Sequence, residues 1–184
     1  MKKDVLFIQG GGEGAFEADR ILAASLQSAL GAEYDVRCPR MPNEESPEMQ
    51  AWKARIAAEL ASSHDAVILV GHSLGGLALL KLLSEEPFDK RVAGLYVIAA
   101  PSRDEENWNY DELTLPRDIA AKLSGIPRIF LYHSRDDEVV PFAHLARHAA
   151  RLPGAIARVT DGRGHQFGND LSDVAADIRA SAIV

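Results

Sequence analysis

This 184-residue sequence is poor in cysteine, in long hydrophobic runs and in positive charge, and each shortage excludes a class of protein. The single cysteine, Cys38, cannot form a disulfide within the chain, which is typical of a reducing compartment, and we expect a buried, inert thiol. No apolar run approaches the roughly 18 residues of a membrane span. The run Val5–Ile8 is too short for a signal peptide, so we expect a cytoplasmic protein without a membrane partner. The net charge of −7 argues against nucleic acid as a partner.

The remaining composition is typical of one globular domain. Hydrophobic residues make up 47% and charged residues 26% of the chain, and its length predicts a single domain over residues 1–184. A chain of this size buries a core that needs neither a disulfide nor a structural metal.

Short apolar runs alternate with longer segments of helical periodicity along the whole chain. This alternation predicts an α/β fold, in which an open, mostly parallel sheet of about six strands carries helices on both faces. The expected strands are Asp4–Gln9, Tyr34–Cys38, Ala66–Val70, Val92–Ile98, Pro127–Tyr132 and Ala155–Thr160. The expected helices are Phe16–Leu30, a segment opened by Ser46-Pro47-Glu48, Leu74–Ser84, Pro141–Leu152 and Asp170–Ala182.

The strongest functional signal is an apolar strand that ends at Gly71-His72-Ser73-Leu74-Gly75, followed at once by a helical pattern. Gly-x-Ser-x-Gly in this context is typical of a nucleophile elbow, a sharp turn that presents the serine hydroxyl at the edge of a sheet. We therefore expect Ser73 to be a nucleophile. The alternative is an ordinary glycine-rich turn in which Ser73 only caps the helix.

A serine nucleophile needs a base that accepts its proton and an acid that orients the base. The loops after the fifth and sixth expected strands supply both, in the order serine, acid, histidine, at the edge where the carboxyl ends of parallel strands meet. We expect His165, on a glycine-bracketed loop, to be the base. The acid is either Asp137 or the adjacent Asp136, with Asp104 after the fourth strand as a more remote candidate.

The negative charge that develops on a substrate carbonyl needs backbone N–H donors. The expected donors are the amide of Leu74, at the start of a helix, and the amide of Gly11, in the glycine run after the first strand. The same run has a second interpretation, because Gly10, Gly12 and Ala15 fit the spacing of a dinucleotide-binding turn. No acid follows at the end of the second strand to bind a ribose, which disfavours that interpretation.

Two further patterns concern ligands. The acidic segment 101–116 is a candidate lid over the carboxyl edge of the sheet, or else a solvated connector, and we expect its Trp108 and the elbow residue His72 to contact the substrate. His144 and His148 lie four residues apart on an expected helix, as metal ligands can. No cysteine or acid is placed to complete such a site, so we expect a solvated helix face, no metal and no cofactor.

Four motifs span nearly the whole chain, in the order Gly10–Gly12, Gly71-His72-Ser73-Leu74-Gly75, Ser134-Arg135-Asp136-Asp137-Glu138-Val139-Val140-Pro141 and Gly164-His165. Together they resemble a minimal α/β-hydrolase without a large cap, similar to the small serine-hydrolase family that includes retinoblastoma-binding protein nine and its bacterial relatives. The resemblance implies that the second aspartate of the Asp-Asp pair, Asp137, is the acid. Gln9 departs from the histidine that many α/β-hydrolases carry before the first oxyanion glycine. The chain has no Leu-x-Cys-x-Glu segment, so binding to the retinoblastoma protein is not expected.

The residues and the resemblance together predict a serine hydrolase that cleaves small carboxylic esters through an acyl-enzyme on Ser73. Its expected partner is a small acyl substrate, bound in an open and shallow site, and no protein partner is predicted. Thioesterase or amidase activity on the same triad is the alternative within enzymes. A non-catalytic binding protein on a hydrolase scaffold is the alternative outside them, since a fold does not determine a function.

Overall fold

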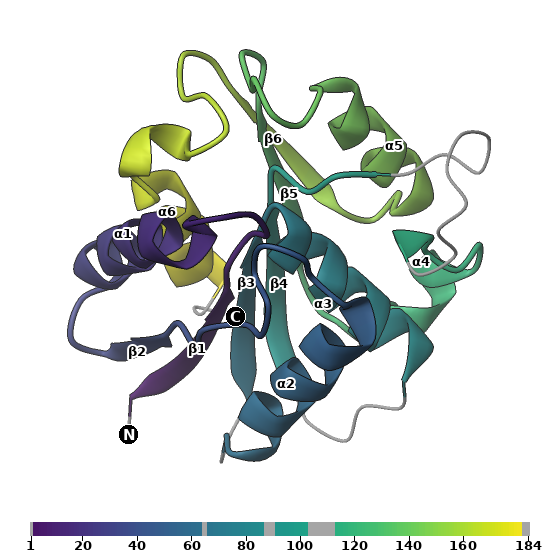
Figure 1. Cartoon of the computed structure of the whole chain (residues 1–184). Helices are drawn as coiled ribbons and strands as arrows, with labels where there is room; N and C mark the ends of the chain where they lie inside the picture. Colours follow the sequence, from purple (N-terminus) through teal and green to yellow (C-terminus); the bar gives the residue numbers. More distant parts are fainter. Residues whose placement is uncertain (1, 64–65, 87–90, 103–112, 182–184) are drawn as a thin grey trace.

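The computed structural model describes residues 2–63, 66–86, 91–102 and 113–181. These residues form a sheet of six strands in the spatial order β2-β1-β3-β4-β5-β6, with every neighbouring pair parallel (Figure 1). Parallel neighbours need long crossover connections, which the helices supply. The strands are β1 (Lys3–Ile8), β2 (Tyr34–Arg37), β3 (Val67–His72), β4 (Val92–Ile98), β5 (Ile129–Ser134) and β6 (Ile156–Thr160).

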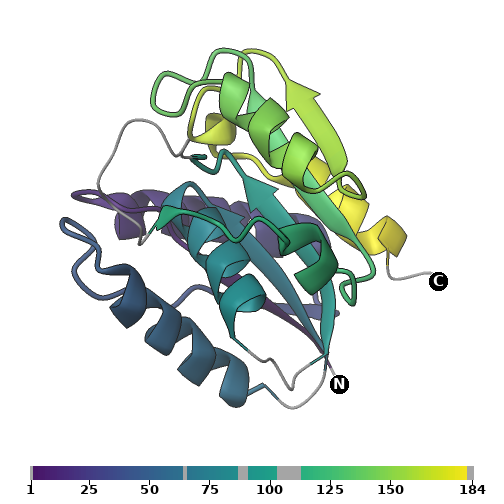
Figure 2. The same cartoon turned by 90° about the vertical axis from the view of Figure 1, so that its right-hand side faces the viewer.

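Helices cover both faces of the sheet, so the central strands are buried on both sides. Helices α1 and α6 lie together against one face, and α2, α3, α4 and α5 lie against the other, which faces the viewer in Figure 2. The helices are α1 (Ala15–Leu30), α2 (Met49–Ala61), α3 (Leu74–Glu85), α4 (Ile119–Lys122), α5 (Ala143–Arg151) and α6 (Ser172–Ser181), and a 3-10 turn covers Phe167–Asn169.

The two-residue period of the strands produces one apolar core on each face of the sheet. In β1, Leu6 and Ile8 belong to the core under α2 and α3, whereas Val5 and Phe7 belong to the core under α1 and α6. Each such side chain, when fully buried, stabilises the fold by about 1.5–3 kcal/mol. The strand is therefore apolar at every one of these positions, which is why it appears in the sequence as an unbroken run.

The parallel strands place the loops after β1, β3, β5 and β6 at one edge of the sheet. The chain leaves β1 toward β2 on one side and later leaves β3 toward β4 on the other, although β1 and β3 are neighbours. Their following loops diverge at the carboxyl ends, which is where ligands bind in open sheets of this kind. Because all strands are parallel, the loops after β5 and β6 lie at this same edge.

The predicted α/β fold with an open parallel sheet is confirmed, with differences at the ends of several elements. β3 continues through Gly71 to His72, beyond the predicted end at Val70, because both residues still pair with β4. The helix expected to begin at Pro47 begins at Met49 instead, after a residue in an extended conformation. The four-residue helix α4 is too short to show a periodicity, so the sequence does not predict it.

The structure bears on the expectations for the thiol of Cys38 and for membrane-spanning segments. Cys38 is half-buried rather than fully buried. Burial, together with the nearby negative charge of Asp19, raises the pKa of its thiol to about 12, so the unreactive thiol form prevails at neutral pH. Over the described parts of the chain, no helix combines the length and the apolar character needed to cross a membrane.

Candidate active site

Ser73 lies between the last residue of β3 and the first residue of α3, at positive φ (φ 51°, ψ −123°), which non-glycine residues rarely adopt. Two glycines allow strand and helix to approach this closely. A Cβ on Gly71 would lie 2.7 Å from the backbone of Gly76, and a Cβ on Gly75 would lie 2.3 Å from two carbonyl oxygens at the end of β1. The Ser73 side chain makes no capping hydrogen bond to α3, so the alternative in which it only caps the helix is not supported.

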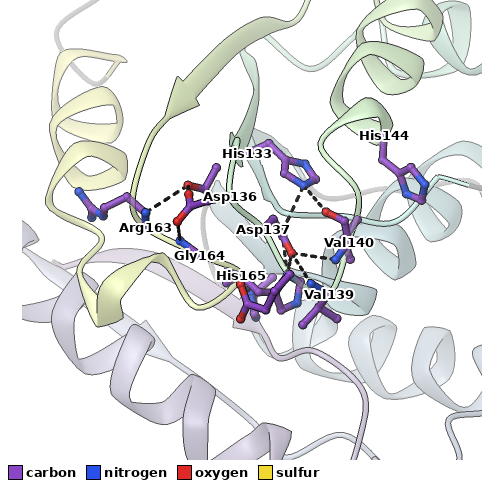
Figure 3. Close-up of polar contacts among 12 residues, drawn as sticks. His133, Asp136, Asp137, Val139, Val140, His144, Arg163, Gly164 and His165 are labelled. Atoms are coloured by element: carbon purple, nitrogen blue, oxygen red, sulfur yellow. Dashed lines mark hydrogen bonds and ion pairs between the residues drawn. The ribbon is translucent and has the colours of Figure 1, made fainter.

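The loops after β5 and β6 bring Asp137 and His165 together (Figure 3). Nδ1 of His165 lies 2.8 Å from Oδ2 and 3.0 Å from Oδ1 of Asp137. The Asp137 side chain is completely buried and also accepts the backbone N–H groups of Val139 and Val140, at 2.9 and 2.7 Å. A carboxylate held in this way keeps a proton on Nδ1 of the imidazole, which leaves Nε2 as the atom that can accept one.

The two neighbours of Asp137 contact the backbone of the histidine loop rather than the ring. Oδ2 of Asp136 accepts the N–H of Gly164 at 3.3 Å, and its Oδ1 accepts the hydroxyl of Ser134. Oε2 of Glu138 accepts the N–H of His165 at 3.0 Å. The structure therefore pairs the imidazole with Asp137 and not with Asp136. The carboxylate of Asp136 instead bonds to the backbone of the loop after β6. The third candidate acid, Asp104, lies outside the described residues.

A second histidine contacts the same carboxylate, as Figure 3 shows. Nε2 of His133 lies 2.9 Å from the carbonyl oxygen of Val140 and 3.2 Å from Oδ2 of Asp137. A carbonyl oxygen can only accept, so this nitrogen carries the proton and donates it toward both oxygens. The sequence analysis does not predict this contact. A histidine near the end of an apolar strand, at the edge where the acid lies, is a signal from which it could have been predicted.

The elbow and the histidine loop meet through the residues beside Ser73. The ring of His165 lies 4.8 Å, between centroids, from the ring of His72. Among the hydrogen bonds of the described residues, Nε2 of His165 takes part in none, and none joins it to the hydroxyl of Ser73. Catalytic hydrogen bonds are often long or poorly aligned before substrate binds.

The glycine run after β1 lies against the elbow. A Cβ on Gly10 would lie 3.2 Å from Cβ of Ser73, and one on Gly11 would lie 2.8 Å from the side chain of Leu74. The amide of Gly10 donates to Asp19 at 2.6 Å, and the amide of Gly12 donates to the carbonyl oxygen of residue 44 at 2.6 Å. For the amides of Gly11 and Leu74, the described part of the chain provides no acceptor in hydrogen-bonding geometry. These are the two amides that the sequence selects as oxyanion donors.

Gln9, which replaces the common histidine, is buried and holds the loop in place. Its side-chain amide donates to Oε2 of Glu44 at 2.7 Å, and its side-chain oxygen accepts the amide of Met41 at 3.0 Å. The same oxygen of Glu44 accepts the N–H of Phe16 at the start of α1, at 2.8 Å. The loop is therefore fixed from both sides by Glu44, a residue that sequence reasoning does not single out.

His72 does not reach toward a substrate, contrary to expectation. Its side chain is only 3% exposed, and both ring nitrogens contact the protein, with Nδ1 2.9 Å from Oδ2 of Asp19 and Nε2 3.1 Å from the carbonyl oxygen of His165. The expectation is corrected because β3 extends through His72 and turns this ring into the core. Asp19 was missed, although an acid on the apolar helical face of Leu22 and Leu26 is a signal for it. Trp108, the other expected substrate contact, lies outside the described residues.

The ionisation of His165 reflects opposing influences. Burial lowers its pKa most, and the positive charge of His72 lowers it further, whereas Asp137 and Glu138 raise it. The net effect is a pKa below the ordinary value of 6.5. His165 is therefore neutral, and able to accept a proton, at neutral pH.

The expected solvated histidine face of α5 is wrong for His148, which is buried. Nε2 of His148 lies 3.1 Å from the carbonyl oxygen of Pro101, and Nδ1 of His144 accepts the amide of Ser102 at 3.0 Å. The two histidines therefore attach the chain after β4 to α5. In the described ranges, no three histidine, cysteine or acidic side chains are grouped so that they could hold a metal ion.

Comparisons with known proteins identify relatives of this chain and of its fold. The putative hydrolase YdeN of Bacillus subtilis (strain 168) is 26% identical over 139 residues, which cover 74% of this chain and 72% of YdeN. The crystal structure of the ydeN gene product of B. subtilis covers 98% of this chain and 99% of its own, with a TM-score of 0.75 and 17% identity.

Two further solved structures share the fold. One is a serine hydrolase involved in carbazole degradation, CarC, with a TM-score of 0.74, 14% identity, and 98% of this chain and 90% of that chain covered. The other is a pyrethroid hydrolase from Sphingobium faniae JZ-2, with a TM-score of 0.66, 18% identity, and 100% and 98% covered. The sequence model of the serine hydrolases matches residues 23–168, which include the elbow, the acid loop and the histidine. The chain therefore belongs to the serine hydrolase family.

Proposed function

We propose that this protein hydrolyses small carboxylic esters through an acyl-enzyme on Ser73, with His165 as general base and Asp137 as the acid that orients it. The observation that carries the proposal is the 2.8 Å bond from Nδ1 of His165 to the buried Asp137, at the sheet edge where Ser73 stands at positive φ. An orienting acid, an imidazole with a free nitrogen and a serine elbow are the parts that two-step acyl transfer requires.

The reaction begins when Oγ of Ser73 attacks the ester carbonyl carbon and gives its proton to Nε2 of His165. The amides of Leu74 and Gly11 donate to the oxyanion of the tetrahedral intermediate, at the N-terminus of α3, where the helix dipole also favours negative charge. His165 then returns the proton to the leaving alcohol, and the acyl group stays on Ser73. Water, deprotonated by His165, then attacks the acyl-enzyme, and His165 returns this proton to Oγ of Ser73 as the carboxylic acid leaves.

The preference for small esters rests on four loops at the site that the structure describes in full, whereas residues 103–112 of the candidate lid after β4 lie outside the described residues. The loops after β1, β3, β5 and β6 are short, and the longest of them is 135–142. None of these loops contains a cap that would enclose a large acyl chain. The relatives include a protein involved in carbazole degradation and a pyrethroid hydrolase, so the shared fold does not select a substrate by itself.

The test uses Ser73→Ala together with Ser124→Ala, a control at an exposed serine that bonds to its own turn. A fluorophosphonate probe should add one adduct to the wild type and to the control, seen by intact mass, and none to Ser73→Ala. Turnover of p-nitrophenyl acetate should fall by about 10⁴–10⁶-fold in Ser73→Ala, because the members of a triad act as a unit. Unchanged turnover in Ser73→Ala would contradict the assignment.

The same assay separates the alternatives on this triad. An ester, a thioester and an amide that share one acyl group are compared by their kcat/KM values. The ester is expected to have the highest kcat/KM. A higher value for the thioester or the amide would assign that activity instead. The absence of both probe labelling and turnover in the wild type would favour a binding protein on a hydrolase scaffold.

A further inference from the structure

Behind the proposed base lies a second aspartate–histidine pair, formed by Asp19 of α1 and His72 at the end of β3. Both side chains are nearly inaccessible, at 2% and 3% exposure. The pair contacts two loops of the site. Asp19 accepts the amide of Gly10 from the glycine loop and the side-chain amide of Gln166 from the histidine loop, while His72 contacts the backbone of His165.

The hydrogen-bond partners of His72 determine its charge. Nε2 faces the carbonyl oxygen of His165, which can only accept a hydrogen bond. Nδ1 faces the carboxylate of Asp19, which already receives N–H groups from Gly10 at 2.6 Å and from Gln166 at 2.7 Å. These two donors to one buried carboxyl group stabilise its ionised, accepting form. Both nitrogens of His72 therefore face acceptors, and both need a proton.

We propose that His72 is a doubly protonated positioning residue, held by Asp19, whose fixed positive charge keeps the neighbouring His165 in its neutral, proton-accepting form. The proposal rests on the proposed function, since it assigns His72 an effect on the base of that reaction. His72 touches neither substrate nor the reacting atoms. It acts through the backbone carbonyl of His165 and through the ring that lies 4.8 Å away.

The charged groups around the base have opposite effects on its protonation. From the loop after β5, Asp137 and Glu138 favour the protonated imidazole, and His133 donates to Asp137 from β5 itself. From the end of β3, the ring of His72 faces the ring of His165, and its charge opposes protonation. From α1, Asp19 partly neutralises that charge. Burial lowers the pKa of His165 most, and the charge of His72 lowers it further, against the upward effects of Asp137 and Glu138.

This balance serves both halves of the reaction. A base that accepts a proton from Ser73 must be neutral at the working pH, yet the imidazolium that forms must also be stabilised. Asp137 alone would hold the imidazole protonated to higher pH. A fixed cation on the opposite side offsets this effect without removing the orienting hydrogen bond. His72 and Asp137 therefore set the ionisation of the base together.

The proposal is tested first by nuclear magnetic resonance of the unmodified protein. Long-range ¹H–¹⁵N correlation spectra distinguish protonated from unprotonated imidazole nitrogens. His72 should show two protonated nitrogens at pH 7. The buried His148 is the internal control, because Nε2 contacts a carbonyl oxygen whereas Nδ1 has no hydrogen-bond partner among the described residues, and it should show one. One protonated nitrogen on His72 would overturn the proposal.

A second arm measures kcat/KM against pH for His72→Gln, which keeps a donor toward the carbonyl oxygen of His165 but carries no charge. The acidic limb of the profile, which reports the base of the free enzyme, should move up by about 0.5–1 pH unit. A lower plateau with an unmoved acidic limb would mean a merely structural role and would overturn the proposal.

The two proposals fail in different ways. If Ser73→Ala keeps full turnover, the proposed function is wrong, but the spectrum of His72 still decides its protonation. If Ser73→Ala is inactive and His72 has a single proton, the proposed function stands and the fixed charge does not. The spectrum is recorded on the wild-type protein, so the decision does not depend on whether a variant folds.

Discussion

The site contains two aspartate–histidine pairs that are nearly identical in their direct contact but differ in their surroundings. Nδ1 lies 2.8 Å from the carboxylate in Asp137–His165 and 2.9 Å from it in Asp19–His72. In the second pair, the other ring nitrogen is bound to a backbone carbonyl, whereas that of His165 makes no hydrogen bond to the described residues. The partner of the second nitrogen, and not the carboxylate, therefore distinguishes the histidine that can transfer protons from the one that is held in place.

The difference arises from where the two histidines lie. His72 is the last residue of a buried central strand, and its partner lies on the apolar face of a helix packed against that strand. His165 lies on a loop at the sheet edge, with its side chain 11% exposed. A loop can present Nε2 toward an incoming ligand, whereas a strand residue enclosed between sheet and helix cannot.

The largest loss of activity is expected from Asp137→Asn, which removes the carboxylate that accepts the proton of Nδ1 of His165. The imidazole then loses its preferred tautomer, and kcat for p-nitrophenyl acetate should fall by about 10³–10⁴-fold. Asp136→Asn is the matched control, because its carboxylate contacts only the loop backbone and a serine hydroxyl. Equal losses in the two variants would contradict the assignment of the acid.

Asp19→Asn should remove the structural pair and destabilise the fold by about 3–5 kcal/mol, since it leaves the buried His72 without its counter-charge. Burial raises the pKa of Asp19, but the hydrogen bond and positive charge of His72 and the bonds from Gln166 and Gly10 outweigh it, so the pKa is below the ordinary 3.8. The stabilisation is therefore present above about pH 4 and is lost as the pH falls through the lowered pKa. Urea unfolding of the wild type and the variant at pH 7 and pH 3 measures this stabilisation. A difference in unfolding free energy between the two proteins that is larger at pH 3 than at pH 7 would contradict the expected pH dependence.

His148 is a third buried histidine, and among the described residues it contacts a backbone carbonyl oxygen instead of a carboxylate. Burial lowers its pKa from 6.5 to about 4, so the folded protein binds this proton only at lower pH than the unfolded chain. Between pH 7 and pH 4 the wild type should lose up to about 3 kcal/mol of stability through this residue. His148→Gln should lack that component. Parallel curves of unfolding free energy against pH for the two proteins would exclude it.

The smallest effect is expected from His133→Gln. Asp137 keeps its bonds to His165 and to two backbone amides, so the variant should lose about tenfold in kcat with little change in KM. Steady-state kinetics with p-nitrophenyl acetate measures both constants. A loss as large as that of Asp137→Asn would mean that His133 is an essential part of the acid–base pair.

Local signals carried the prediction of the fold and of the nucleophile. The apolar runs reproduce the strands to within two residues at their ends, and Gly71 and Gly75 mark the turn at Ser73 because no other residue fits so close to the backbone. The choice between Asp136 and Asp137 is different. Neither spacing nor burial separates two adjacent acids in a sequence, so that choice depended on the resemblance until the bond to His165 was seen.

Periodicity and glycine turns are local properties, so they suffice to predict a serine elbow at the end of a central strand and an acid and a histidine after later strands. The contacts of His72 depend instead on the packing of distant segments. Its partner Asp19 is 53 residues away, and Gln166, which completes the cluster, is 147 residues from Asp19. No local pattern joins positions so far apart, because the packing of α1 against the sheet brings them into contact.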